Sequence, residues 1–416
     1  SILDIDERVN ICSMIFSDLL IKIFPSDISV ENPWSTDVSM NIPSIDSTKT
    51  SSFKVIYREL VLTSMLDNDW SDSNILLDYI INYQKQYAIG ILPSKTKIDA
   101  EILYNKMNPF GWNRLFLAYF LFGFILLNFL FTSIFYDSNF ITSCINYIKI
   151  GIVFSFLFHL LALVLRWYIS GHAPWSNAYE SVIFIAFATM LAGFVFTKKS
   201  NFALVAACFV TTMLLFVANL NWLNPEITNL VPVLKSYWLM IHVSVITSSY
   251  GFFGLCAFIG FLNLFFIIIS YNKKIKSHVK TLTVINEQSM IIGLFLLTVG
   301  TFLGGVWANE SWGRYWGWDP KETWALVSIL TYSLILHIRL MKFKKYILYF
   351  NTCSLFGFSS ILMTYFGVNY YLDGLHSYAA GDAFPIPSFV LPTSIILILL
   401  SMLSFFRFNK WLLKYE

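Results

Sequence analysis

The sequence predicts an all-α polytopic membrane protein with about nine transmembrane helices, preceded by part of a mixed extracytoplasmic domain. Of its 416 residues, 56% are hydrophobic and only 13% are charged, and the mean hydropathy is +0.63. The apolar residues gather in stretches of the roughly 20 residues that a helix needs to cross a bilayer. This composition excludes an ordinary soluble globular protein. The net charge of +3 reflects membrane topology rather than affinity for nucleic acid.

Residues 1–112 are polar and are predicted to form part of the extracytoplasmic domain. Strand-like runs, such as Phe53 to Tyr57, alternate with stretches rich in Ser, Thr, Asp and Asn, and a helical pattern covers Lys95 to Met107. The chain begins without methionine, and residues 1–20 lack the n-region and cleavage site of a signal peptide. We therefore expect a fragment or a processed product.

The apolar stretches that follow are interpreted as the transmembrane helices. They cover about residues 115–135, 150–168, 179–197, 203–221, 237–270, 289–306, 324–341, 346–366 and 388–406. The fifth is too long merely to cross the bilayer, so we expect it to project beyond it.

Lysine and arginine gather in alternate loops, and such loops stay on the cytoplasmic side. The residues concerned are Lys198, Lys199, Lys273, Lys274, Lys276, Lys280, Arg339, Lys342, Lys344, Lys345, Arg407, Lys410 and Lys414. The opposite loops, at residues 169–178, 222–236, 307–323 and 367–387, carry few basic residues. We predict that these loops and residues 1–112 are extracytoplasmic.

A tryptophan-rich segment, WANESWGRYWGWDPKETW at residues 307–324, stands between two apolar stretches. Its conspicuous residues are Trp307, Trp312, Gly313, Tyr315, Trp316, Trp318 and Asp319. Such a loop at the end of a span can lie in the membrane interface as an aromatic shelf, which suits a large planar ligand. On aromatic content alone, an ordinary interfacial belt is the simpler interpretation.

The string WGxxWxWDPKETWA resembles the signature of the WWD family of haem-handling proteins. Its continuation from Asp319 to Thr323 is similar to the CcsA/ResC branch, which acts in cytochrome c biogenesis. The resemblance implies a CcsA-like transmembrane haem-handling domain over residues 113–416, with its WWD loop at 307–324. The stretch LPSKTKIDAEILYNK is similar to the end of the CcsB/ResB half of fused CcsBA proteins. That similarity implies a CcsB/ResB-like end in residues 1–112, and it favours the bacterial inner (cytoplasmic) membrane while leaving a thylakoid membrane open.

Two histidines fall in strings that resemble the family's external haem ligands. His242 stands in YWLMIHVSVITSSYGFF, five residues inside the fifth span, and His376 stands in TYFGVNYYLDGLHSYAAG. The resemblance implies that they are the two axial imidazoles of one haem iron. By themselves, they fit an interfacial histidine and an exposed loop histidine.

His337 lies about 13 residues along the seventh span, at a depth where an ionisable group is costly. The resemblance implies an intramembrane haem ligand there, and a hydrogen-bonded packing histidine is the alternative. In fused relatives the second ligand of this site comes from an early span of the CcsB half, so a separate subunit or a missing N-terminal portion would supply it. His159 and His172 are weaker candidates, which fit helix packing and a tight turn.

The resemblance implies a System II cytochrome c synthase, of the haem lyase type, or its haem-handling subunit. Haem b, as substrate and bound ligand, would move across the membrane to the external site and be attached through thioethers to the CxxCH cysteines of apocytochrome c. The five cysteines of this chain form no CxxC pair, so the acceptor cysteines must belong to another chain. The implied partners are apocytochrome c, a CcsB/ResB subunit or domain, thiol-reducing partners and membrane lipid, with no nucleic acid.

No side chain of the WWD loop is assigned a catalytic role. Asp319 is expected to hold the loop or to cap a helix beginning near Pro320, and Glu322 lies in the first turn of that helix. Lys321 is expected to pair with either a haem propionate or a phospholipid headgroup. Two other functions stay open: a haem exporter that hands haem to a separate chaperone or ligase, and a secondary transporter of another solute. The sequence shows no internal repeat of the kind common in such transporters.

Overall fold

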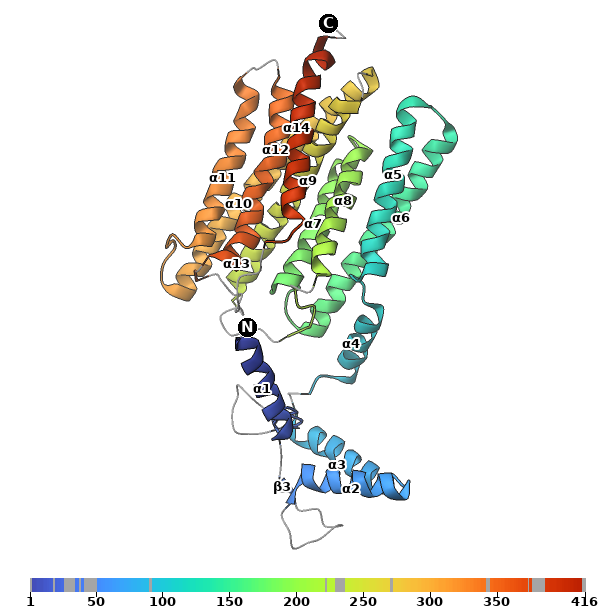
Figure 1. Cartoon of the computed structure of the whole chain (residues 1–416), viewed down its shortest axis with the longest axis vertical. Coiled ribbons are helices and arrows are strands. Elements are labelled where there is room, and N and C mark those ends of the chain that lie inside the picture. The colour runs from blue at the N-terminus through green and yellow to red at the C-terminus, as the bar shows by residue number, and fades with distance from the viewer. Residues whose placement is uncertain are drawn as a thin grey trace. The chain divides into compact units, whose positions relative to one another are not determined.

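The computed structural model of the chain describes residues 2–17, 19–25, 34–36, 39–40, 51–89, 92–220, 223–228, 236–269, 272–341, 345–372, 374–375 and 386–413. The chain separates into two compact units, residues 1–99 and residues 100–416 (Figure 1). Each unit has its own packing and is described by itself.

The first unit contains three helices and two very short antiparallel strand pairs. The helices are α1 (Ile2–Phe16), α2 (Phe53–Asp67) and α3 (Ser71–Tyr87). In one strand pair β1 (Phe24–Pro25) lies beside β2 (Trp34–Ser35), and in the other β3 (Ser39–Met40) lies beside β4 (Ser51–Ser52). Its core is formed by Phe24, Phe53, Leu76 and Ile80.

The strand predicted from Phe53 to Tyr57 is wrong, because α2 begins at Phe53. The Phe53 ring packs edge-on against Phe24, with 5.2 Å between the ring centroids. This contact orients a helix across the small core, and such tertiary packing overrides the weak β preference of aromatic residues. The predicted helix from Lys95 to Met107 is confirmed as α4 (Lys95–Met107).

The predicted all-α multi-pass architecture is confirmed in the second unit. Nine helical segments of the described residues are long and apolar enough to cross a membrane. These nine segments contain ten α-helices, because α12 and α13 belong to one segment, Tyr346–Tyr371. The helices are α5 (Leu117–Phe135), α6 (Asn139–Ser170), α7 (Ala178–Thr197), α8 (Asn201–Ala218), α9 (Tyr237–Ile269), α10 (Lys273–Trp312), α11 (Pro320–His337), α12 (Tyr346–Leu362), α13 (Val368–Tyr371) and α14 (Val390–Leu413). Trp112–Phe116 and Met363–Gly367 are single π-helical turns that open the first span and join α12 to α13, and Ile338–Met341 continues α11 as a 3₁₀ turn.

Several helices are longer than the apolar stretches that predicted them. The second span covers 139–170 rather than 150–168, and the sixth covers 273–312 rather than 289–306. Backbone hydrogen bonding continues through polar flanks until a capping residue ends it, so hydropathy sets the apolar core of a span but not its ends. With 40 residues, α10 is about 60 Å long.

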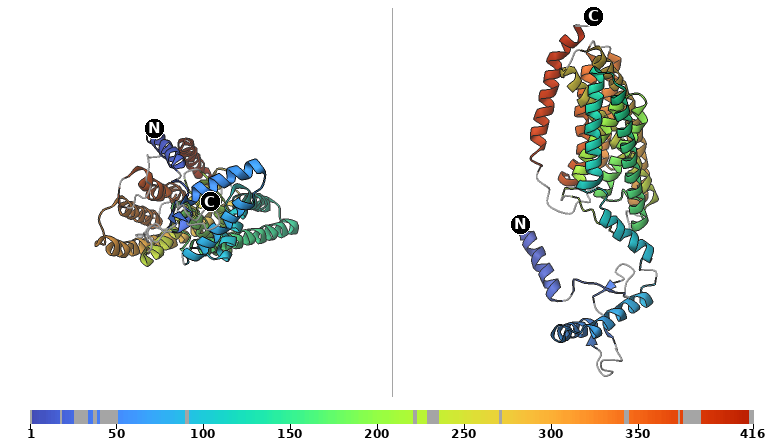
Figure 2. Two further views of the ribbon diagram at one scale, coloured as in Figure 1. Left: turned by 90° about the horizontal axis from the view of Figure 1, so that it is seen from below. Right: turned by 90° about the vertical axis from the view of Figure 1, so that its right-hand side faces the viewer.

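Helix α9 is the centre of the membrane unit, in contact with α7, α10, α12 and α14. Figure 1 shows α5 and α6 together at one edge and α11 at the other, and Figure 2 shows α14 along the outer side of the bundle. Buried amides join the central helices: Asn263 donates to Asn351 at 2.7 Å, and Asn286 donates to the same Asn351 oxygen at 3.2 Å. Such side-chain hydrogen bonds stabilise the packing of membrane helices. Apolar side chains contribute less there, because they are about as favourably placed against lipid as against another helix.

Candidate functional site

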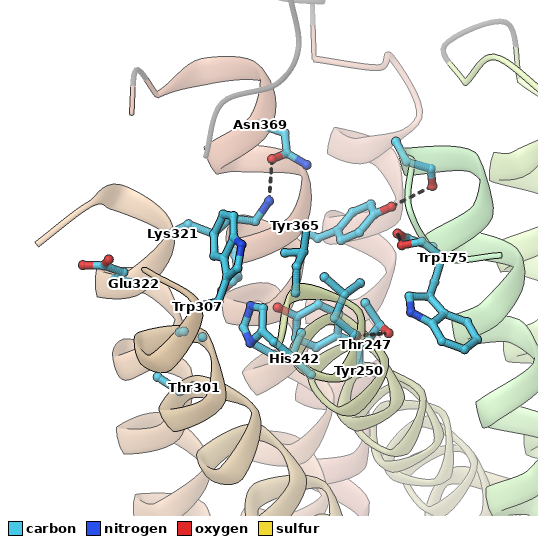
Figure 3. Close-up of a pocket in the computed structure, with 18 of the residues that line it drawn as sticks. Trp175, His242, Thr247, Tyr250, Thr301, Trp307, Lys321, Glu322, Tyr365 and Asn369 are labelled. Atoms are coloured by element: carbon cyan, nitrogen blue, oxygen red, sulfur yellow. Dashed lines mark hydrogen bonds between the residues drawn. The ribbon is translucent and has the colours of Figure 1, made fainter. Parts of the chain in front are cut away.

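A cavity of about 680 Å³ lies where α7, α9, α10 and α11 meet the π-helical turn Met363–Gly367 and α13 (Figure 3). This volume is in the range of pockets that enclose a drug-sized ligand. Its wall is strongly aromatic, with side chains contributed from distant parts of the chain: Trp175, Tyr250, Trp307, Tyr315, Trp316 and Tyr365. His242 and Lys321 are among the polar residues that face the same space. An aromatic enclosure with few polar groups suits a large, flat, mainly apolar ligand.

The imidazole of His242 lines this cavity from the second turn of α9. Its Nδ1 lies 2.7 Å from the carbonyl oxygen of Gly300 on α10. A carbonyl can only accept, so Nδ1 carries a proton, and in the neutral form of the ring Nε2 therefore holds the lone pair. A metal-ligating histidine is held in this way, by a hydrogen bond from the opposite ring nitrogen. His242 therefore has the tautomer that an axial iron ligand needs.

The ring of His242 lies directly against the backbone of α10 at Gly304. A Cβ at position 304 would come within 2.6 Å of the imidazole Cε1, far inside van der Waals contact. The absence of a side chain at Gly304 thus allows the ring to occupy its place between α9 and α10.

The predicted tryptophan loop begins later than the sequence suggested, because α10 continues through Trp312. Gly313 ends this helix in the left-handed conformation, with φ of 70°, as helix C-termini often require. Trp307 is fully buried and packs edge-on against Trp312, with 4.7 Å between centroids. The segment is therefore a helix end followed by a loop at 313–319, rather than one flat shelf.

The structure brings only part of the predicted WWD set to the cavity. Trp307, Tyr315 and Trp316 line it, whereas Trp312, Gly313, Trp318 and Asp319 do not. Trp318 is 71% exposed and adopts a positive φ of 59°, an uncommon conformation for a bulky residue. Trp175, which precedes α7 and lies outside the tryptophan-rich segment, also lines the cavity and donates from Nε1 to the carbonyl of Met240 at 3.0 Å.

Asp319 caps α11, as predicted, and also ties two segments together. Its carboxylate accepts from the amide of Lys321 at 3.1 Å, and Glu322 closes a capping box by accepting from the amide of Asp319 at 3.3 Å. The other Asp319 oxygen accepts from the amide of Leu375 at 2.6 Å. The short segment 374–375 is thereby fixed against the start of α11.

Loss of the Asp319 carboxylate should destabilise the protein measurably. Asp319→Ala removes a helix cap and leaves the Leu375 amide without its acceptor, at a cost of about 2 kcal/mol. Asp319→Asn should cost about 1 kcal/mol, because asparagine still caps the helix but its NH2 group cannot accept from the Leu375 amide as the second carboxylate oxygen does. Thermal unfolding of the two purified variants in one detergent gives the comparison. Equal melting temperatures for Asp319→Ala and the unmodified protein would contradict the assigned role.

The remaining histidines lie apart from the cavity or outside the described residues. His376, the predicted partner of His242, lies outside the described residues, although the adjacent Leu375 is described. His337 is the last residue of α11, with its side chain exposed and Nδ1 2.7 Å from the carbonyl of Ser333. It stands 16 residues beyond Lys321, about 24 Å along the helix. The cavity and His337 thus mark opposite ends of α11.

The two weaker histidine candidates make packing contacts. His159 is fully buried, with Nδ1 3.3 Å from the Tyr119 hydroxyl and Nε2 3.1 Å from the carbonyl of Ile183. His172 has its two ring nitrogens each 3.3 Å from a backbone carbonyl, of Ala173 and Thr228. Neither residue lines the cavity.

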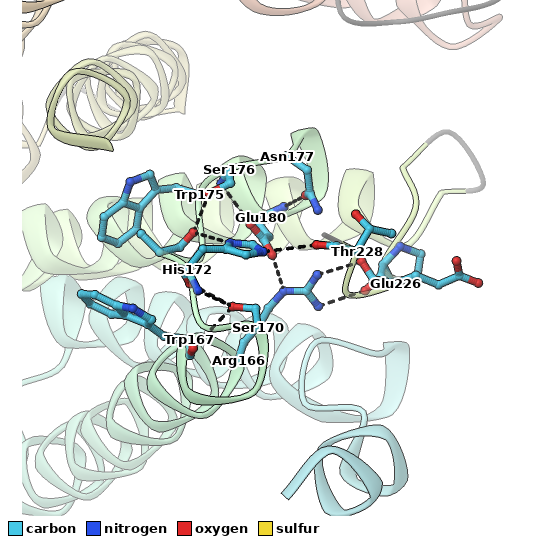
Figure 4. Close-up of polar contacts among 12 residues, drawn as sticks. Arg166, Trp167, Ser170, His172, Trp175, Ser176, Asn177, Glu180, Glu226 and Thr228 are labelled. Atoms are coloured by element: carbon cyan, nitrogen blue, oxygen red, sulfur yellow. Dashed lines mark hydrogen bonds and ion pairs between the residues drawn. The ribbon is translucent and has the colours of Figure 1, made fainter. Parts of the chain in front are cut away.

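A buried ion pair that we did not single out in the sequence supports one wall of the cavity. Arg166 on α6 donates from Nε to Glu180 on α7 at 2.9 Å, and both side chains are inaccessible to solvent (Figure 4). The guanidinium also donates to the carbonyls of Pro225 and Glu226, at 2.9 and 3.1 Å. The second Glu180 oxygen accepts from the amide of Ser176, which lines the cavity. The sequence did contain a signal for this pair, because Arg166 and Glu180 are charged residues that lie inside predicted spans.

The fold and the cavity together define a polytopic α-helical membrane protein whose cavity, lined by aromatic side chains and one oriented imidazole, suits a flat ligand. Residues 175–376 match the family model described as cytochrome C assembly protein. The chain is 36% identical over 254 residues to the cytochrome c biogenesis protein CcsA of Prochlorococcus marinus, covering 52% of this chain and 80% of that protein. The chain belongs to the CcsA family of cytochrome c assembly proteins.

Two further relatives extend the comparison. The chain is 38% identical over 232 residues to CcsA of Chlamydomonas reinhardtii, covering 53% of this chain and 64% of that protein. It is also 44% identical over 398 residues to Protein NrfI of Wolinella succinogenes, covering 92% of this chain but only 42% of that protein. The chain therefore spans less than half the length of NrfI, and the match to NrfI includes most of the N-terminal unit.

Proposed function

We propose that this chain holds haem in the aromatic cavity and presents it for attachment to apocytochrome c, as the haem-handling part of a System II cytochrome c synthase. The observation that carries the proposal is His242, whose Nδ1–H is bound by the Gly300 carbonyl inside a cavity walled by Trp307 and Trp316. Haem b is a planar ligand whose iron takes axial imidazoles and whose faces require apolar contact. His376 would be the second axial ligand, by resemblance to the family.

The basic loops support an extracytoplasmic position for the cavity. The cavity is built from the first turns of α9 and α11 and the last turns of α10. Lys273 and Arg339 stand at the opposite ends of α10 and α11. Since basic loops stay in the cytoplasm, the cavity would open on the other side of the membrane.

His337 is proposed as the ligand of an earlier haem site, at the cytoplasmic ends of the helices. Its exposed position at the end of α11 agrees with a site completed by another polypeptide, of the CcsB/ResB type. Haem would pass from that site to the cavity, and the CxxCH thiols of apocytochrome c would add to its vinyl groups. The chain contributes binding, orientation and iron ligation, while thiol-reducing partners keep the acceptor cysteines reduced.

The test is co-expression of the chain with a CcsB-type partner and an apocytochrome c, in a bacterial host without its own synthase. The purified protein should carry haem with a bis-imidazole absorption spectrum, and covalent holocytochrome should accumulate. Bound haem without covalent product would favour the haem exporter instead. Absence of haem in every preparation would contradict the proposal.

Trp316→Ala should weaken haem binding in the same preparations about ten-fold, because a cavity-lining aromatic contact of this kind contributes about 1.4 kcal/mol. Trp318→Ala is the matched control, since Trp318 belongs to the same loop but is 71% exposed and does not line the cavity. Haem per polypeptide, measured from the absorption spectrum, should fall in the first variant and stay near the unmodified value in the second. An equal fall in both variants would indicate a general interfacial role for the loop.

A further inference from the structure

Lys321 brings a positive charge to a cavity that is otherwise mainly aromatic. Its side chain extends from the first turn of α11, and its Nζ donates to Oδ1 of Asn369 on α13 at 2.9 Å. Among the described residues that line the cavity, Lys321 is the only lysine or arginine. An ammonium has three N–H donors, and its known acceptor here is a neutral amide.

The Asp319 carboxylate attracts this charge, but neither Asp319 nor Glu322 forms a salt bridge with Lys321 among the described residues. Glu322 also lines the cavity, but its oxygens accept from the amides of Gly317 and Asp319 and face Arg314 at 3.4 Å. A partly buried charge is costly unless an opposite charge meets it, so this end of the cavity is suited to an anionic group of the ligand.

The position of Lys321 relative to His242 indicates what that anionic group is. Both residues line the same cavity as Trp307, and Figure 3 shows the side chains of all three grouped on one side of it, away from Trp175. A ligand coordinated at its centre by His242 and lying against Trp307 would bring its periphery to Lys321. We propose that Lys321, held by Asn369, binds a carboxylate at the edge of the ligand. The proposal rests on the proposed function, under which the ligand is an iron porphyrin and the group is one of its propionates.

Asn369 would act as a positioning residue for this contact. It fixes the ammonium at 2.9 Å without cancelling its charge, which an aspartate at the same position would do. By binding a propionate, the pair would turn the propionate edge of the porphyrin toward α13. The vinyl groups would then face the opposite side of the cavity.

The test compares two probes, haem b and its dimethyl ester, in which methylation removes the negative charges of the two propionates. The full chain, purified without haem, is titrated with each probe in the same detergent. The unmodified protein should bind haem b about ten-fold or more tightly than the ester. Lys321→Gln should abolish this preference while leaving the ester affinity unchanged, and Lys321→Arg should retain most of it. Lys274→Gln is the control, because Lys274 faces Asp137 away from the cavity.

The outcomes separate this proposal from the proposed function. Equal affinity of the unmodified protein for both probes overturns the carboxylate contact and leaves haem binding intact, whereas failure to bind either probe overturns both proposals. An equal loss of both probes in Lys321→Gln, with an altered haem spectrum, would make Lys321 a structural residue and overturn the contact. Repeating the titration in nanodiscs tests the other source of an anion: a ten-fold weaker affinity in phosphatidylglycerol than in phosphatidylcholine would assign Lys321 to a lipid headgroup.

Discussion

His242→Ala is expected to abolish the bis-imidazole spectrum of the haem-loaded protein and to weaken haem binding by roughly 100-fold or more. Loss of a residue that merely supports a metal ligand costs about 10- to 100-fold in metal affinity, so loss of a ligand should cost at least as much. The ring now lies between α9 and α10, with its Nδ1–H bound by Gly300. Removal of the ring leaves an imidazole-sized space, so added free imidazole should restore the spectrum.

Two matched variants distinguish iron ligation from packing at this position. Gly304→Ala keeps the imidazole but displaces it, because the new Cβ would lie 2.6 Å from the His242 ring, and the spectrum should change without complete loss of haem. His172→Ala should leave the spectrum intact, since His172 contacts backbone carbonyls outside the cavity. An unchanged spectrum in His242→Ala would assign the ligand role to another residue.

Arg166→Met is expected to lower the stability of the protein by about 3–5 kcal/mol. The substitution keeps much of the side-chain volume but leaves the Glu180 carboxylate, which is inaccessible to solvent, without its counter-charge. The Pro225 and Glu226 carbonyls lose their donors as well. A second substitution, Glu180→Gln, removes the orphaned charge and should recover a large part of the loss.

The control for this effect is the exposed ion pair between Arg339 and Glu287. Arg339→Met should cost less than about 1 kcal/mol, because solvent screens a pair whose arginine is 62% exposed. Thermal unfolding in one detergent ranks the four proteins. Equal melting temperatures for Arg166→Met and Arg339→Met would show that the buried pair contributes no more than a surface pair.

Arg166→Met should also lower haem occupancy, although Arg166 does not line the cavity. Glu180 accepts from the amide of Ser176 and contributes its own amide to Asn177, at 2.9 and 2.8 Å. These bonds hold the turn that carries Trp175 into the cavity wall. Haem per polypeptide should be measured below the melting temperature of the variant, where the protein is still folded. A decrease there shows that Arg166 and Glu180 support the Trp175 turn, and it is separate from the effect of global unfolding.

Several features of the site could be predicted from the sequence because they depend on neighbouring residues. The start of α11 is an example: Asp319, Pro320 and Glu322 form a capping box within four consecutive positions, and the spacing alone predicts it. The position of His242 near the start of a long apolar helix could also be predicted from the sequence. The helix that begins at Phe53 could not be predicted, since the aromatic residues Phe53 and Tyr57 fit a strand or a helix until Phe24 packs against Phe53.

By itself, the sequence determined the all-helical membrane fold, the order of the spans and the family, because hydropathy, capping and the tryptophan motif are properties of continuous segments. Only the tertiary structure decided which side chains share the cavity. Trp307 proved to be a buried helical residue rather than part of a loop, and Lys321 meets Asn369 across 48 residues of sequence. The pairing of Arg166 with Glu180 depends on how α6 packs beside α7. These contacts depend on the crossing of helices remote in the chain, and no local pattern encodes that geometry.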